Sequence, residues 1–219
     1  MRVRINWTYQ SPKAKQTVLF QSDELEADSA LMLSHDLEKT GRTKTLEFLD
    51  SRGTAWSKKE LGKLMEELES EPSSVTVFFD GSYEKETGNS GAGAAIYYTL
   101  EKEKFRIRMN RKIDELSSNN EAEFAALLLA ANGLADLGVK GQDVSFKGDS
   151  LVVINQLSGE WPCYEEQHQM WIGRIEAVLS AAHITGDFQS VPRKENKEAD
   201  QLAKQAVLGV EVSSQIKLD

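Results

Sequence analysis

The sequence predicts an α/β protein in which a mixed five-stranded sheet flanked by helices follows a smaller α+β domain. Three successive strand-like runs, followed by helices that alternate with strands, predict the mixed sheet with helices on both faces. The polar, proline-containing segment 69–74 separates this region from a shorter patterned region before it, and such a segment is typical of a linker. A chain of 219 residues has room for one ordinary domain and one small one. We therefore expect domains at residues 1–72 and 73–219.

The first domain is predicted to mix strands and helices. Apolar residues at helical spacing stop at Gly41, and Ser57 with Glu60 has the pattern of a capping box at the start of a second helix. No catalytic grouping is present, and the role of this domain is left open, with a protein or a nucleic acid as its candidate partner. The predicted elements are strands at 3–9, 16–21 and 43–49, a turn at 11–13, and helices at 27–39 and 58–68.

The second domain supplies the five strands of the predicted sheet. Glycines at Gly88, Gly91 and Gly93 mark the hairpin between its first two strands. The predicted elements are strands near 75–80, 92–99, 104–110, 143–148 and 184–190, and long helices near 120–138, 164–182 and 196–208.

The composition limits the compartment and the partners. The single cysteine, Cys163, excludes a disulfide framework, and a reducing compartment suits it best. No apolar run approaches the length of a membrane span, and the N-terminus lacks the apolar core of a secretory signal, so we expect a cytoplasmic protein without a membrane partner. The net charge of −9 argues against a generic polyanion binder. The oligomeric state is left open.

Four acidic residues of the second domain stand where predicted elements begin or end. Asp80 closes an apolar strand and Asp149 closes the strand at 143–148, while Glu123 and Asp200 lie in the first turns of two helices. Carboxylates gathered from these ends would repel one another unless cations lay between them. The pattern therefore predicts a site for two divalent metals, which is typical of phosphodiester chemistry.

Each of these acids also has a purely structural explanation. An aspartate before glycine, as at Asp80, is an ordinary turn, and Asp149 would be a suitable cap for a following helix. Asp200 would be an ordinary helix-surface acid. Glu121 and Glu123 both lie in the first turn of one helix, where acids favour the helix dipole, so the residues alone do not decide between them.

Four short motifs occur in the order and approximate spacing of type 1 ribonuclease H domains. No single motif is specific, but four in register with the expected order of elements are. From about residue 73 to 208 the chain resembles this family, and most of all its compact bacterial and archaeal branch, which implies a ribonuclease H-like fold for the second domain. The motifs are Phe79-Asp80-Gly81-Ser82, Ser118-Asn119-Asn120-Glu121-Ala122-Glu123, Gly148-Asp149-Ser150 and Asn196-Lys197-Glu198-Ala199-Asp200.

The resemblance implies a metal-dependent endonuclease that hydrolyses the RNA strand of RNA/DNA hybrids with two ions, Mg²⁺ or Mn²⁺. It selects Glu123 over Glu121, which would then be a solvated acid at the helix start. Asn119 and Asn120 would contact the substrate groove, including the 2′-hydroxyl that distinguishes RNA from DNA. The implied catalytic residues and metal ligands are Asp80, Glu123, Asp149 and Asp200. The other implied substrate-binding residues are Gly81, Ser82, Ser118, Ser150, Arg193 and Asn196.

Two departures from the family pattern favour an alternative function. The loop before the last helix lacks the histidine that many members carry, with Arg193 as the candidate substitute, and Leu151 stands where many members have glutamine. The alternative is a nucleic-acid-binding or protein-binding module that keeps the ribonuclease H fold but cleaves weakly or not at all. A related exonuclease or resolvase is a third reading, which the pair Asn119-Asn120 disfavours.

Three further features of the second domain have simpler structural explanations. Lys104, Arg106 and Arg108 alternate with apolar residues, so this strand is either an ordinary solvated face or a phosphate-binding patch. Cys163 does not have the spacing to the histidines that a structural zinc site needs. Trp161 is expected to pack against the sheet.

Overall fold

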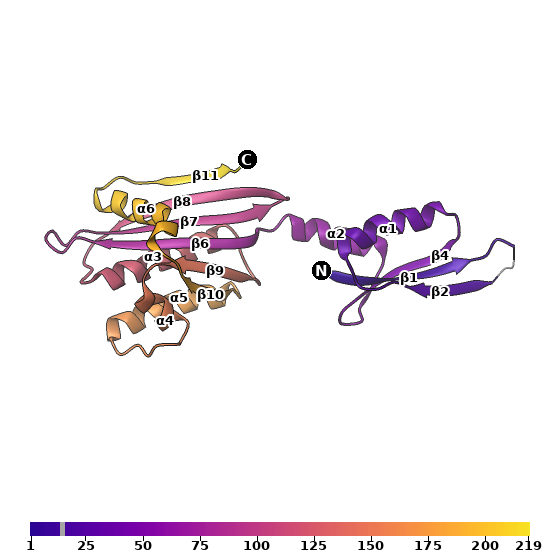
Figure 1. Cartoon of the computed structure of the whole chain (residues 1–219), viewed down its shortest axis with the longest axis horizontal. Helices are drawn as coiled ribbons and strands as arrows, with labels where there is room; N and C mark the ends of the chain where they lie inside the picture. Colours follow the sequence, from indigo (N-terminus) through magenta and orange to yellow (C-terminus); the bar gives the residue numbers. More distant parts are fainter. Residues whose placement is uncertain (14–15) are drawn as a thin grey trace. The chain divides into compact units, whose positions relative to one another are not determined.

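The structure, a computed structural model, describes residues 1–13 and 16–219 and separates into two compact units (Figure 1). Unit 1 is Met1–Ser70 and unit 2 is Glu71–Asp219. The two units are connected through Ser70–Pro72, a shorter segment than the predicted linker, because helix α2 continues to Glu69 and strand β6 begins at Ser73. Among the helices of the described residues, none is both long enough and apolar enough to cross a membrane.

Unit 1 is an α+β unit with an antiparallel sheet in the order β2-β1-β4-β5, in which the short β3 also pairs with β1. Its core consists of Val3, Ile5, Ala27, Ala30, Phe48 and Leu61. Ser57 and Glu60 form the predicted capping box at the start of α2. The elements are β1 (Arg2–Gln10), β2 (Thr17–Gln21), β3 (Leu25–Glu26), α1 (Ala27–Lys39), β4 (Thr43–Asp50), β5 (Ala55–Trp56) and α2 (Lys58–Glu69).

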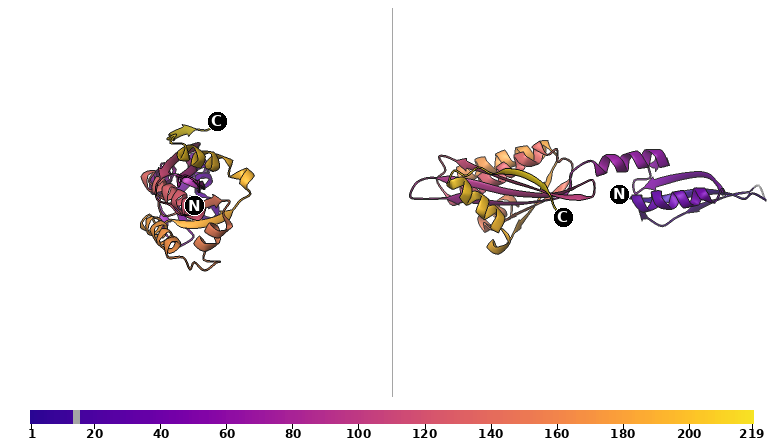
Figure 2. Two further views of the ribbon diagram at one scale, coloured as in Figure 1. Left: turned by 90° about the vertical axis from the view of Figure 1, so that its left-hand side faces the viewer. Right: turned by 90° about the horizontal axis from the view of Figure 1, so that it is seen from above.

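Unit 2 is a mixed sheet in the order β10-β9-β6-β7-β8-β11 with helices on both faces (Figures 1 and 2). The predicted α/β class and the mixed sheet are confirmed. The strands are β6 (Ser73–Tyr83), β7 (Ser90–Leu100), β8 (Glu103–Ile113), β9 (Asp143–Gly148), β10 (Thr185–Ser190) and β11 (Ser213–Lys217). The helices are α3 (Asn119–Asp136), α4 (Leu151–Leu157), α5 (Glu166–Ala181), the 3₁₀ turn η1 (Arg193–Glu195) and α6 (Lys197–Val207).

The sheet has six strands rather than the five predicted. The additional strand, β11, pairs antiparallel with the outer edge of β8, from Ser213 opposite Met109 to Lys217 opposite Phe105. All five residues of β11 are exposed, and only one of them, Ile216, is apolar. The segment therefore lacks the alternation of apolar and polar residues that predicts a strand.

Strand β6 extends beyond Asp80, which was predicted to end it. The strand remains paired with β7 as far as Tyr83 opposite Ser90, because the two strands form one long hairpin. Its parallel pairing with β9 stops earlier, at Phe78 opposite Lys147. At Asp80, β6 is therefore still paired with β7 on one side but is no longer paired with β9 on the other.

Helix α6 packs directly against the backbone of β7 at Gly91 and Gly93, where the strand has no side chain. A Cβ atom at Gly93 would lie 2.4 Å from the Ala203 nitrogen and 2.5 Å from the Ala199 oxygen, and one at Gly91 would lie 2.3 Å from the Ala203 oxygen. Both glycines are therefore needed for this close contact between helix and strand. Side chains of β7 that point to the other face, such as Ile96, pack beneath α3 near Gly133.

Candidate metal centre

Three of the four predicted carboxylates converge in unit 2. One oxygen each from Asp80, Glu123 and Asp149 lies within 4.8 Å of the other two. Asp80 and Asp149 are brought together because β6 and β9 run parallel side by side up to the pair Phe78 and Lys147. Glu123 joins them from the first turns of α3, which packs on β6. All three ligand atoms are carboxylate oxygens, the donors that hard divalent cations prefer.

The charges of this cluster are poorly compensated by protein groups. Burial, together with the charge of Asp149, raises the pKa of Asp80 to about 8. Burial and the charge of Asp80 raise the pKa of Glu123 well above its usual range, although the backbone N–H of Gly81 donates to its carboxylate. The Oε2 atom of Glu123 is buried without a hydrogen-bond partner. A cation bound among these oxygens would remove both the repulsion and the missing contact.

Asp200 lines the same pocket but stands outside the group of three. The pocket has a volume of about 410 Å³ and includes all four acids among its lining residues. Lys204 Nζ lies 2.7 Å from Oδ2 of Asp200, and Arg193 Nη2 lies 3.0 Å from Oδ1. Burial acts to raise the pKa of Asp200, but hydrogen bonds from Lys204 and Arg193 outweigh it and lower the pKa. Asp200 is therefore an ionised acid paired with two cations.

Asn196 connects the strands that carry the cluster. Its side chain is 1% exposed, and Nδ2 donates to the carbonyl oxygen of Phe79 at 2.9 Å. The same Nδ2 lies 3.4 Å from a carboxylate oxygen of Asp80 and of Asp149. A buried amide in this position orients the two acids, and its burial argues against the direct substrate contact that was expected of it.

The remaining predicted substrate contacts fall into two groups. Gly81, Ser82, Asn119, Ser150 and Arg193 line the pocket, whereas Ser118 and Asn120 are not among its lining residues. Ser118 caps α3 by accepting a hydrogen bond from the Glu121 N–H at 3.2 Å, and Ser150 caps α4 in the same way through Val153. Ser118 is therefore a helix cap, while Ser150 both caps a helix and lines the pocket.

One expectation about the motif residues is wrong, and a second residue has a structural role that was not expected. Glu121 is not a solvated acid, because it is 5% exposed and accepts hydrogen bonds from both the N–H and the hydroxyl of Ser117 at 2.6 and 2.8 Å. Gly81, which the resemblance implies to bind substrate, lines the pocket. It also lets the backbone of α3 come close, since a Cβ at Gly81 would lie 2.2 Å from Ala122 C and Glu123 N.

The basic strand has a structural partner. Glu198 of α6 forms ion pairs with Arg106 and Arg108, at N···O distances of 3.0 and 3.1 Å, and accepts a hydrogen bond from the hydroxyl of Tyr97. Arg106 and Arg108 are each about three-quarters buried, so the solvated-face interpretation is wrong for these two residues. Their charges hold α6 on the sheet and are not free for phosphate.

Sequence reasoning missed two residues that line the pocket, and it misjudged the burial of Trp161. Lys204 and Tyr83 line the pocket. The position of Lys204 four residues after Asp200 on one helix was a usable signal, because residues at this spacing are neighbours on a helix surface. Trp161 is 44% exposed and was wrongly expected to pack against the sheet.

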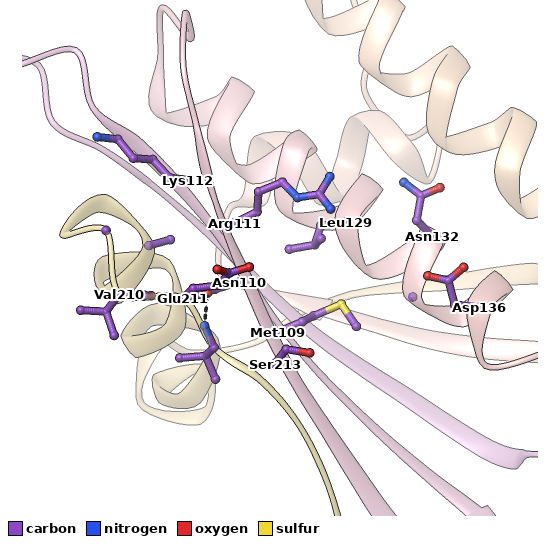
Figure 3. A pocket seen from close by; sticks show the side chains of 14 residues that line it. Met109, Asn110, Arg111, Lys112, Leu129, Asn132, Asp136, Val210, Glu211 and Ser213 are labelled. Carbon is purple, nitrogen blue, oxygen red and sulfur yellow. Dashed lines mark hydrogen bonds between the residues drawn. The ribbon is translucent and has the colours of Figure 1, made fainter.

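A second pocket of unit 2 lies near the start of β11, beside the end of β8 (Figure 3). It has a volume of about 470 Å³, and the charged residues that line it, Arg111, Lys112, Asp136 and Glu211, are all exposed. The one buried polar side chain there, Asn110, is fully satisfied. Its Nδ2 donates to the carbonyls of Leu202 and Val210 at 2.9 Å, and its Oδ1 accepts from Val212 N at 2.7 Å. We call this space the edge pocket.

Comparison with known proteins agrees with the fold and the position of the carboxylates. Residues 78–206 match a protein family described as Reverse transcriptase-like. The chain belongs to this family. The matched residues contain all four acids of the carboxylate pocket.

The relatives extend this assignment. The chain is 41% identical over 219 residues to YpeP of Bacillus subtilis, an uncharacterized protein, and the match covers 100% of this chain and 96% of YpeP. It is 29% identical over 137 residues to ribonuclease HI of Halobacterium salinarum, and this match covers 61% of this chain and 64% of that enzyme. Unit 2 is therefore a ribonuclease H-like domain of this family.

Solved structures show the same fold. A crystal structure of RNase H1 from Halobacterium salinarum NRC-1 aligns with a TM-score of 0.50 and 26% identity over 62% of this chain and 98% of that chain. The structure of LC11-RNase H1 in complex with an RNA/DNA hybrid aligns with a TM-score of 0.50 and 22% identity over 62% of this chain and 97% of that chain.

Proposed function

We propose that this protein is a metal-dependent endonuclease that hydrolyses the RNA strand of RNA/DNA hybrids. The observation that carries the proposal is the convergence of Asp80, Glu123 and Asp149 within 4.8 Å, in a pocket that Asp200 also lines. The similarity to ribonuclease HI of Halobacterium salinarum supports this substrate, and the complex of LC11-RNase H1 with a hybrid agrees with it.

The residues present fit divalent metal ions. The donors are carboxylate oxygens, two of the acids have raised pKa values, and Oε2 of Glu123 lacks a partner. We propose that Asp80, Glu123, Asp149 and Asp200 hold two Mg²⁺ or Mn²⁺ ions. When bound, such ions would activate a water for attack on phosphorus and stabilise the departing 3′-oxygen, leaving 3′-hydroxyl and 5′-phosphate ends.

The other pocket residues position the acids and the substrate. Asn196 holds Asp80 and Asp149 at a fixed separation through its buried amide. Asn119 is exposed at the pocket and has the donor and acceptor needed to contact a 2′-hydroxyl. The side chain of Arg193 is 73% exposed and pairs with Asp200, so it places a positive charge where a phosphate would approach.

A second function is a binding module that keeps the fold but cleaves weakly. The observation that favours it is the pairing of Asp200 with both Arg193 and Lys204, which already neutralises the fourth carboxylate. Leu151, which is 57% exposed beside Ser150, cannot donate a hydrogen bond to a nucleic-acid base. In this function the pocket would bind nucleic acid without an efficient attack on phosphorus.

Cleavage of labelled substrates distinguishes the two functions. We expect the full chain, with Mg²⁺ or Mn²⁺, to cut the RNA strand of a hybrid and to leave an RNA duplex and single-stranded RNA intact. Hybrid binding without cleavage in either metal would support the binding module. Cleavage of single-stranded RNA at the same rate would overturn the proposed specificity.

Two expectations remain predictions from the sequence. We propose that residues 1–72 act as a separate domain, with residues 73–219 carrying the nuclease site. A cytoplasmic location also stays a prediction, for which the single free cysteine is the support.

A further inference from the structure

Strand β2 of unit 1 has an unprotected edge. It lies at the end of the sheet order β2-β1-β4-β5, and among the described residues no strand pairs with its outer side. All five residues, Thr17–Gln21, are exposed, and none is charged or proline. Charged residues, prolines and bulges are the usual means by which an edge strand avoids pairing with another chain. The open N–H and C=O groups of β2 are therefore available to a further strand.

The side chains of β2 make the same edge apolar. Val18, Leu19 and Phe20 are 46%, 64% and 50% exposed. Phe20 lies opposite Trp7 of β1, with ring centroids 5.5 Å apart, and Val18 lies opposite Tyr9, so these four side chains share one face.

This face continues into an apolar pocket of about 440 Å³ beneath α1. Trp7 and Phe20 form part of its wall, and Leu33 and Leu37 of α1 form another part. Leu33 is 45% exposed. The exposed apolar surface therefore extends from the outer strand of the sheet onto the neighbouring helix α1.

The sequence of β2 is complementary to itself when it is paired antiparallel about Leu19. In that register Val18 of one copy lies opposite Phe20 of the other, and Leu19 lies opposite Leu19. The ends have opposite charges, because Lys13 precedes the strand and Asp23 and Glu24 follow it. Antiparallel pairing brings the lysine end of one copy beside the acidic end of the other, so both apolar and charged groups match across a twofold axis.

We propose that a second copy of this chain docks on β2 and joins the two unit 1 sheets into one continuous antiparallel sheet. A nucleic acid fits this surface poorly, because β2 has no cation and acids follow it at Asp23 and Glu24. The docking surface is distinct from the carboxylate pocket, and the inference does not depend on the proposed nuclease function.

Sedimentation velocity on the full chain over a range of concentrations tests the association. We expect a monomer–dimer equilibrium that Leu19→Lys weakens at least about tenfold, because two buried cations would face each other at the twofold axis. Met32→Lys is the matched control, since Met32 is an exposed apolar residue, 70% accessible, on α1 outside β2. Circular dichroism checks that both variants fold, and Asp23→Lys with Lys13→Asp should restore the association that either change alone weakens.

Disulfide trapping tests the register. In a Cys163→Ser background, Leu19→Cys should give a disulfide-linked dimer on mild oxidation, because residues that face each other in antiparallel strands lie within bridging distance. Met32→Cys should remain unlinked. A wild-type chain that stays monomeric at all concentrations, or equal association of the Leu19→Lys and Met32→Lys variants with wild type, overturns the proposal. Monomeric wild type whose hybrid binding falls on Leu19→Lys would instead assign the edge to nucleic acid.

Discussion

Two pockets of unit 2, the carboxylate pocket and the edge pocket, are close in volume, at about 410 and 470 Å³, but they differ in how their polar groups are satisfied. The carboxylate pocket contains buried acids with raised pKa values and one buried oxygen without a partner. In the edge pocket the charged residues are exposed and the buried amide of Asn110 makes three hydrogen bonds. Because an unpaired buried charge is costly, its presence in a pocket points to a missing ligand. The volume of a pocket does not by itself point to one.

The contrast is tested most strongly by removing one charge from each pocket. We expect Asp80→Asn to reduce hybrid cleavage by about a thousandfold or more, because the residue is central to the carboxylate cluster. Asp136→Asn, which makes the same change in the edge pocket, should leave the rate within about twofold. Rates come from single-turnover cleavage of a labelled hybrid. Persistent cleavage in Asp80→Asn, or an equal loss in Asp136→Asn, would remove the distinction.

The pH dependence of stability without metal tests the unpaired charge directly. The pKa of Asp80 is raised from 3.8 to about 8, so the folded state holds a proton that the unfolded state has released over this range. The free energy of unfolding of the metal-free protein should therefore fall as the pH rises from about 4 to 8, by a few kcal/mol.

Urea unfolding at several pH values with a chelator measures this slope. The slope should be shallower in Asp80→Asn, and Mg²⁺ should stabilise the wild type at pH 8 more than it stabilises the variant. A slope that is identical in the two proteins would show that the carboxylates of the pocket are already compensated within the chain.

Glu198 provides an intermediate case, in which a partly buried charge is paired. Glu198→Gln leaves Arg106 and Arg108 without their common carboxylate, so we expect a loss of about 2 kcal/mol in the free energy of unfolding. The exposed Glu176→Gln on α5 is the matched control, with an effect below about 0.5 kcal/mol. Urea unfolding with Mg²⁺ present measures both. No difference between the two variants would mean that this cluster contributes little to holding α6.

The smallest effect is expected at the edge pocket. Asp136→Asn combined with Glu211→Gln should change the free energy of unfolding by less than about 0.5 kcal/mol, because both acids are exposed. Isothermal titration calorimetry with Mg²⁺ should give the same Mg²⁺ affinity for the double variant as for the wild type. A loss of metal binding in this double variant would move the metal centre to the edge pocket.

The sequence was sufficient for the features that depend on local pattern. Asp80 follows an apolar run within β6 and Asp149 follows β9, and parallel neighbouring strands bring residues in these positions close together. The capping box of Ser57 and Glu60 is likewise a pattern of four residues, and it is present. These predictions needed only spacing along the chain and the order of the elements.

The features that the sequence did not reveal depend on contacts between distant segments. The partner of Arg106 and Arg108 is about ninety residues away on α6, so the strand alone indicated only a basic face. Strand β11 pairs with the open edge of β8. Its own five residues, all exposed, give no local signal that they form a strand. The group that excludes a side chain at Gly81 is the backbone of α3, which spacing along the chain did not indicate.

The close seating of α6 on Gly93 has a consequence for how the pocket can be altered from outside it. Gly93 lies opposite Asp80 in the hairpin, and its missing methyl group leaves the space filled by the backbone at Ala199, the residue before Asp200. An added methyl would push the helix outward as a rigid rod and carry Asp200 away from three acids that stay in place. The position of Asp200 relative to the other three acids thus depends on a residue that has no functional group of its own, and variation there offers a route to adjust the fourth carboxylate without replacing any acid.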